Sequence, residues 1–273
     1  EDGPTWHMSK TGTPTMGGLM FIIAVTVVCL TVGFSCMANG EWGHIFILVF
    51  GLVFGAIGFL DDYEKLRHKQ NLGLSAKMKF LLQLLAATCF LLLLRFTGYL
   101  SPNLYIPFWN TYVPVSEPLY FIFAAFVIVG TVNAVNITDG VDGLAAGTCV
   151  PVFLCFTAIV FCWGKEYMPQ GIFASGMVGA LLGFLIYNFN PARVFMGDTG
   201  SLFLGGCICS SRFASCRSLK RFRTSSRWRI SSSPTASAYS KWPPSTTIWR
   251  WAAGRAGNGK KKRSSSCLRA SHS

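Results

Sequence analysis

Residues 43–62 read G-H-I-F-I-L-V-F-G-L-V-F-G-A-I-G-F-L-D-D, an apolar run that closes on two adjacent aspartates. A helix needs about 20 apolar residues to cross the hydrocarbon core of a bilayer. Carboxylates beside a bilayer are costly, so those found there are candidates for a functional site. The stretch therefore predicts a membrane-spanning helix with a functional site at one end.

Similar apolar runs recur along the chain, in which 51% of residues are hydrophobic and 13% are charged. This composition is typical of membrane proteins and excludes an ordinary soluble domain of this length. The expected fold class is all-α, a polytopic membrane helix bundle. We predict spans at about residues 16–38, 43–60, 78–97, 118–136, 142–163 and 171–189, and a seventh that begins at Leu202 and stops after about eight residues.

Basic residues give the expected orientation, because loops rich in Lys and Arg stay on the cytoplasmic side of the membrane. The loop over 61–79 holds five basic residues, and the loop over 98–117 holds none. Alternation of the spans from these two loops predicts that Asp61, Asp139 and Asp198 all lie at the cytoplasmic face. Acidic motifs far apart in the sequence can then form one site.

Asp61 and Asp62 are expected to end a helix and to be followed by a basic loop that runs through Lys77. Adjacent carboxylates repel each other, and a divalent metal or a nearby lysine would stabilise both as anions. The alternative is that two acids simply mark a solvated helix end.

Residues 133–147 read N-A-V-N-I-T-D-G-V-D-G-L-A-A-G and combine two asparagines, two aspartates and three glycines. Amide and carboxylate oxygens are hard ligands that suit magnesium or the polar groups of a nucleoside. Glycine lets the backbone approach a ligand closely. Turn chemistry between two spans is the alternative interpretation, although the asparagine pair is more polar than a turn requires.

Two shorter motifs are less specific. F-M-G-D-T-G-S sets Asp198 between two glycines, where it can contact a cation or a phosphate, and Phe195 lies three residues before it. Residues 10–18, K-T-G-T-P-T-M-G-G, resemble a phosphate-contacting loop but do not match a P-loop. A connecting turn is the alternative interpretation of the Asp198 motif, and packing is the alternative for Phe195.

Taken together, the four motifs supply what phosphoryl transfer needs: carboxylates to hold magnesium and lysines to neutralise phosphate charge. The membrane setting implies that one substrate is a lipid phosphate. A membrane transporter is the alternative from another class. It would place ionisable groups near the middle of the bilayer, whereas these groups are predicted at the cytoplasmic ends of spans.

The motifs G-T-P-T-M-G-G, F-L-D-D-Y-x-K, G-L-S-A-K-x-K, N-A-V-N-I-T-D-G-V-D-G-L-A and F-N-P-A-R-V-F-M-G-D-T-G-S resemble, in this order, those of the phospho-N-acetylmuramoyl-pentapeptide transferases. These enzymes are members of the polyprenyl-phosphate N-acetylhexosamine-1-phosphate transferase superfamily. The resemblance covers residues 1–206. It implies transfer of phospho-N-acetylmuramoyl-pentapeptide from its UDP-linked precursor to undecaprenyl phosphate, with Mg²⁺, giving lipid I and UMP for peptidoglycan synthesis.

The resemblance also implies a location and a role for each motif. The protein would lie in the bacterial inner membrane as a homodimer, without a nucleic-acid partner. Asp198 would hold magnesium, and Asp61 and Asp62 would act in catalysis, either by deprotonating the lipid phosphate or by organising the metal. The other implied positions bind substrate: Lys10, Thr15, Lys65, Lys77, Asn133, Asn136, Asp139, Asp142 and Phe195. A related transferase that moves N-acetylglucosamine phosphate remains the alternative within the superfamily.

The last part of the chain departs from this family. Residues 210–273 carry 15 basic residues and no acidic one, whereas residues 1–209 hold the other 9 basic residues and all 11 acidic ones. One interpretation is a disordered basic tail that binds nucleic acid or anionic lipid. A change of reading frame is the interpretation that we adopt, with a transferase core over 1–206 and an out-of-frame tail over 207–273.

A choice of codons exists that fits this interpretation. Ala238–Arg250 can be encoded so that a shift of one base reads R-I-F-K-M-A-P-I-H-H-H-L-E. This is the histidine motif of the family, and its three histidines arise from Ser245–Ile248. We therefore expect the chain as it stands, a fragment without that motif, the last spans and an N-terminal helix, to be inactive or nearly so.

Overall fold

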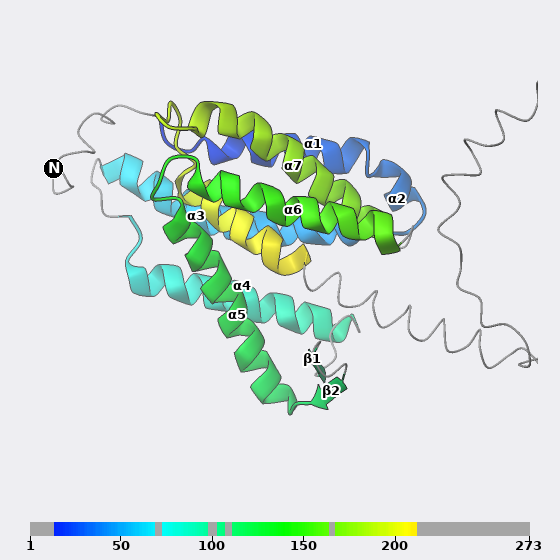
Figure 1. Cartoon of the computed structure of the whole chain (residues 1–273). Coiled ribbons are helices and arrows are strands. Elements are labelled where there is room, and N and C mark those ends of the chain that lie inside the picture. The colour runs from blue at the N-terminus through cyan, green and yellow to red at the C-terminus, as the bar shows by residue number, and fades with distance from the viewer. Residues whose placement is uncertain (1–13, 69–72, 98–102, 107–110, 164–166, 212–273) are drawn as a thin grey trace, which may run out of the picture. The chain divides into compact units, whose positions relative to one another are not determined.

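The computed structural model describes residues 14–68, 73–97, 103–106, 111–163 and 167–211 (Figure 1). Lys10 and the predicted tail beyond Ser211 lie outside the described residues. The helices are α1 (Gly18–Thr31), α2 (Phe34–Ala38), α3 (Gly43–His68), α4 (Ala76–Phe96), α5 (Glu117–Thr138), α6 (Leu144–Trp163) and α7 (Met168–Asn188). A further helix, drawn in yellow, covers 197–211 and is called the Asp198 helix below.

Four of these helices, α3, α4, α5 and α7, are long and apolar enough to cross a membrane, while α1 and residues 144–159 of α6 are shorter apolar helices. The all-α, polytopic membrane bundle predicted from the sequence is thus confirmed. Many of their large apolar side chains are exposed on the outside of the bundle, among them Ile122 and Phe126 of α5. Such exposure is what a lipid-facing surface requires, because the bilayer replaces the protein core as their apolar surroundings.

Two predicted boundaries were wrong. The first span is not continuous, since α1 ends at Thr31 and α2 begins at Phe34, with Gly33 packed against the ring of His44. More important for the site, α3 does not end at Asp61 and Asp62 but continues to His68. Lys65 lies one turn after Asp61 on the same helix and pairs with it, a spacing that stabilises a helix in this polar stretch.

The predicted loop over 98–117 contains a short hairpin rather than irregular chain throughout. Strands β1 (Asn103–Ile106) and β2 (Thr111–Pro114) pair antiparallel, with Leu104 opposite Val113 and Tyr105 opposite Tyr112. Both segments contain the aromatic and β-branched residues that strands favour. The hairpin links α4 to α5 and is remote in sequence from every residue proposed for the site.

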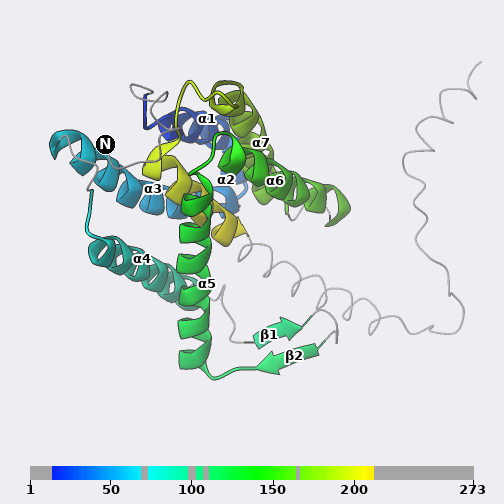
Figure 2. The same ribbon diagram turned by 60° about the vertical axis from the view of Figure 1, so that its left-hand side comes forward.

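The Asp198 helix joins two apolar clusters. Phe203 and Cys207 belong to a cluster formed with α1, α3, α6 and α7, and Leu202 and Cys209 belong to one formed with α3, α4 and α5. Figure 2 shows this helix passing between α3 and α5. The helix reaches Ser211, which is buried, so the predicted boundary at 206 falls inside it.

Glycines allow this close packing. A Cβ at Gly51 would lie 2.3 Å from the Cys207 sulfur, and one at Gly58 would lie 2.1 Å from the Asp198 carbonyl oxygen. On the other side, a Cβ at Gly205 would lie 2.6 Å from the Val132 Cα of α5. Small residues let helix backbones approach closely in membrane bundles. Gly58 in particular brings the first turn of the Asp198 helix against the acidic end of α3.

Candidate functional site

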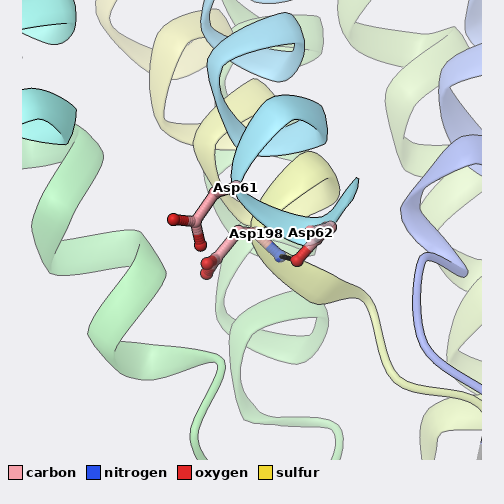
Figure 3. Close-up of side chains that lie close together, drawn as sticks. All are labelled: Asp61, Asp62 and Asp198. Atoms are coloured by element: carbon pink, nitrogen blue, oxygen red, sulfur yellow. Dashed lines mark hydrogen bonds between the residues drawn. The ribbon is translucent and has the colours of Figure 1, made fainter. Parts of the chain in front are cut away.

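Three carboxylates meet where α3 contacts the first turn of the Asp198 helix (Figure 3). Asp61, Asp62 and Asp198 each offer one oxygen, and these oxygens all lie within 4.8 Å of one another. Asp61 and Asp62 are buried, with 3% and 7% exposure, and the side chain of Asp198 is 17% exposed. The structure therefore brings together the acidic motifs that the sequence separates by more than a hundred residues.

Two lysines offset part of this charge. Lys65 Nζ lies 2.6 Å from Asp61 Oδ2 and 2.5 Å from Asp198 Oδ2. Lys79 Nζ, from the first turn of α4, lies 3.1 Å from Asp198 Oδ2 and 3.7 Å from Asp61 Oδ2. Sequence reasoning missed Lys79 and proposed Lys77 instead, which is exposed on the first turn of α4.

Asp62 is oriented differently from its neighbour. Its carboxylate accepts hydrogen bonds from the backbone amides of Asp198, at 3.2 Å, and Thr199, at 2.9 Å. The hydroxyl of Thr199 donates a third, at 2.6 Å. Asp61, in contrast, accepts a hydrogen bond from the Leu74 amide at 2.8 Å and faces the two lysines.

Asn136 of α5 joins the cluster from the opposite side of the Asp198 helix. Its amide nitrogen donates to Asp198 Oδ1 at 2.6 Å and lies 2.8 Å from Ser201 Oγ. Burial opposes ionisation of Asp198, but hydrogen bonds with Asp61, Lys65 and Asn136, and the charge of Lys79, hold the pKa of Asp198 below its ordinary value. Asp198 is therefore an anion at neutral pH, as a metal ligand must be.

The other residues of the 133–147 motif are arranged around this cluster. Burial, followed by the negative charges of Asp198 and Asp62, raises the pKa of Asp139 from 3.8 to about 7. Asp142 accepts a hydrogen bond from the Ala192 amide at 3.3 Å, which ties the α5–α6 turn to the segment before Asp198. Asn133 pairs with Gln83 of α4, its amide nitrogen 2.6 Å from Gln83 Oε1, and so contacts α4 rather than the three carboxylates.

Residues 14–18, the described part of the motif over 10–18 and called the entry loop below, pack against the segment that precedes Asp198. The Phe195 amide donates to the Pro14 carbonyl at 3.0 Å, and the Gly17 and Gly18 amides donate to the carbonyls of Phe195 and Met196 at 2.8 and 2.9 Å. Thr15 is exposed within this loop, and Phe195 is half-buried. Two sequence motifs at opposite ends of the described chain thus form one wall beside the carboxylates.

The donor set fits a hard divalent cation. Carboxylate and amide oxygens are the ligands that magnesium and calcium prefer, whereas zinc and copper sites use histidine and cysteine. The oxygens of Asp61, Asp62 and Asp198 lie close enough to share one ion. With two lysines beside them, the cluster can bind a metal and the phosphates that it would bridge.

Comparison with known proteins agrees with this chemistry. A family model described as glycosyl transferase family 4 matches residues 44–215. The phospho-N-acetylmuramoyl-pentapeptide-transferase of Staphylococcus carnosus (strain TM300) is 46% identical over 213 residues, which cover 77% of this chain and 64% of the relative.

Two further relatives carry the same name. The one from Listeria innocua is 45% identical over 211 residues, and the one from Halalkalibacterium halodurans is 43% identical over 210 residues. Each alignment covers 77% of this chain and 63% of the relative. The chain therefore spans less than two thirds of the length of these proteins.

Proposed function

The chain belongs to glycosyl transferase family 4, and from that membership we propose that it derives from a phospho-N-acetylmuramoyl-pentapeptide transferase of peptidoglycan synthesis. The substrates would be UDP-N-acetylmuramoyl-pentapeptide and undecaprenyl phosphate, and the products lipid I and UMP. The observation that carries the proposal is the cluster of Asp61, Asp198, Lys65 and Lys79, which come from three helices and meet at one end of the bundle.

The proposed reaction is a phosphoryl transfer. An oxygen of undecaprenyl phosphate bonds to the β-phosphorus of the donor, the bond from that phosphorus to the bridging oxygen breaks, and UMP leaves with the electron pair. Mg²⁺ held by Asp198 would neutralise charge on the phosphates. Phosphoryl transfer depends mainly on positioning and electrostatic stabilisation, so this account needs no covalent intermediate on the protein.

The proposed role of each residue in the reaction follows from the contacts that it makes. Lys65 and Lys79 reduce the electrostatic repulsion between the carboxylates and supply positive charge for phosphate oxygens. Asp61 faces the lysines and is placed to accept a proton from the lipid phosphate. Asn136 and Asp139 would bind the donor beside Asp198, with Phe195 and Thr15 at the wall formed by the entry loop.

The site is proposed to face the cytoplasm of the bacterial inner membrane. The support is the distribution of basic residues, since Lys65, Arg67, Lys77 and Lys79 all lie at the same ends of α3 and α4 as the carboxylates. Loops on the cytoplasmic side carry an excess of such residues. A soluble nucleotide-linked donor is available on that side, and the lipid acceptor would enter from the bilayer.

The test is an assay of UMP release from UDP-N-acetylmuramoyl-pentapeptide with undecaprenyl phosphate in detergent. It should use the full-length gene product with the reading frame restored after about residue 206. We expect Mg²⁺-dependent release and a lipid-linked product, and no product from UDP-N-acetylglucosamine. Turnover of UDP-N-acetylglucosamine instead would assign the chain to the related N-acetylglucosamine-phosphate transferases, and no release from either donor would reject the proposal.

A further inference from the structure

We infer that Asp62 is a positioning residue, which caps the Asp198 helix and thereby fixes Asp198, while Asp61 is the aspartate of the pair that faces the cations. This inference rests on the proposed function, because it divides the roles within the same metal and phosphate site. Neighbouring residues on a helix point about 100° apart, so the side chains of the two adjacent acids leave α3 in different directions. Figure 3 shows the Asp62 carboxylate directed at the backbone nitrogen of Asp198 and the Asp61 carboxylate directed away from it.

The first argument is that the Asp62 carboxylate is already occupied. Oδ1 accepts from the Asp198 amide, and Oδ2 accepts from both the amide and the hydroxyl of Thr199. The first amides of a helix lack partners within the helix, and a side-chain oxygen commonly caps them. Here the cap is supplied by α3 rather than by the residue before the helix, so it joins the two elements that carry the three carboxylates.

The second argument is steric. Gly197 adopts a φ of +73°, and a Cβ at this position would lie 2.8 Å from Asp62 Oδ2. Gly58 on α3 leaves room for the Asp198 carbonyl, which a Cβ would approach to 2.1 Å. The two glycines therefore let Asp62 reach the amides at the start of the Asp198 helix, and they leave Oδ2 enclosed.

The third argument is the distribution of the cations. Lys65 Nζ lies 2.6 Å from Asp61 and 2.5 Å from Asp198, but 3.9 Å from Asp62. Lys79 contacts Asp61 and Asp198. Positive charge thus gathers between Asp61 and Asp198, on the side of the cluster that Asp62 does not face.

The experiment measures binding of Mn²⁺, as a substitute for Mg²⁺, to the 273-residue chain in detergent, using the electron paramagnetic resonance signal of free Mn²⁺. The variants are Asp198→Asn, Asp62→Asn, Thr199→Val and the double variant Asp62→Asn/Thr199→Val. Thr131→Val is the matched control, because Thr131 is a half-buried threonine of α5 whose hydroxyl donates to the Val127 carbonyl of the same helix. Circular dichroism and size-exclusion chromatography establish that each variant is folded.

We expect Asp198→Asn to abolish measurable binding. A residue that orients a ligand typically changes metal affinity about 10-fold to 100-fold, so Asp62→Asn should weaken binding by about 10-fold, and Thr199→Val by a smaller factor. The double variant should bind no more weakly than Asp62→Asn alone, because both changes break the same contact. Thr131→Val should leave the affinity unchanged.

The outcomes separate the two proposals. If the unmodified chain binds no Mn²⁺, the metal site of the proposed function fails. If it binds Mn²⁺ but Asp62→Asn loses binding as completely as Asp198→Asn, or if the effects of Asp62→Asn and Thr199→Val simply add, then Asp62 does not act through Thr199. In that case the positioning role is overturned and the metal site stands.

Discussion

Lys79 Nζ lies 3.1 Å from Asp198 Oδ2, a contact that joins the start of α4 to the start of the Asp198 helix. Lys65 reaches the same oxygen from α3. The Asp198 carboxylate therefore has two ammonium groups beside it, and these ion pairs connect α3, α4 and the Asp198 helix. The same groups would contact phosphate oxygens in the proposed reaction.

Replacement of Lys79 by Gln should lower the rate of UMP release by about 100-fold, a typical effect of removing one group that stabilises developing charge. Arg67→Gln is the matched control, because Arg67 is an exposed basic residue at the end of α3. It should retain a rate close to that of the unmodified enzyme. Equal rates for the two variants would show that Lys79 has no part in the reaction.

Asp139 should make the stability of the fold depend on pH. Its pKa rises from 3.8 to about 7 on folding, chiefly because of burial. The stability that this shift contributes is fully present below pH 3.8 and is lost as the pH rises through 7. Asp139→Asn should therefore raise the melting temperature in detergent and EDTA more at pH 8 than at pH 5.

The control for this measurement is Glu41→Gln, which removes an exposed carboxylate. Its effect on the melting temperature should be small at both pH values, because exposed substitutions rarely change stability. An Asp139→Asn variant that melts like the unmodified protein at pH 8 would contradict the burial of a charge at this position.

Gly197→Ala should destabilise the protein. A non-glycine residue in a left-handed backbone conformation costs about 1–2 kcal/mol, and the added Cβ would also press on Asp62 Oδ2. Gly130→Ala in α5 is the matched control, since a Cβ there meets no atom within 4 Å. Alanine is the better helix former, so Gly130→Ala should be neutral or slightly stabilising. A thermal unfolding series in which both variants behave alike would disprove the strain at Gly197.

The reading-frame prediction is tested by the DNA around codons 200–210. We expect one inserted or deleted base there, and its correction should restore a downstream sequence that contains three consecutive histidines. An uninterrupted frame through this region would mean that the basic tail is a genuine part of the protein.

Much of the fold could be predicted because membrane spans leave a strong signal in hydropathy. The centres of α3, α4, α5, α6 and α7 were all found from apolar runs. The end of α3 was missed because charged residues over 61–68 resemble a loop when hydropathy alone is used. Spacing would have corrected this, since Asp61 and Lys65 lie four residues apart, as oppositely charged pairs on helices do.

The site could be predicted only in part. Alternation of the spans, oriented by the basic loops, predicted that Asp61, Asp139 and Asp198 lie at one face of the membrane. The three-carboxylate cluster agrees with this for Asp61 and Asp198. Helical periodicity favours Lys79 over Lys77. Lys79 lies one and two turns before Gln83 and Ala87, which are buried, whereas Lys77 lies on another face of the helix. The capping role of Asp62 was not accessible, because it depends on contact between α3 and a helix more than a hundred residues away.

The most direct test of the central claim is the Mg²⁺ dependence of UMP release by the frame-restored enzyme and its Asp198→Ala variant. The account predicts turnover that requires Mg²⁺ in the unmodified enzyme, and a loss of at least about 1,000-fold in the variant while it remains folded. A near-normal rate for Asp198→Ala would contradict the assignment of this cluster as the site of phosphoryl transfer.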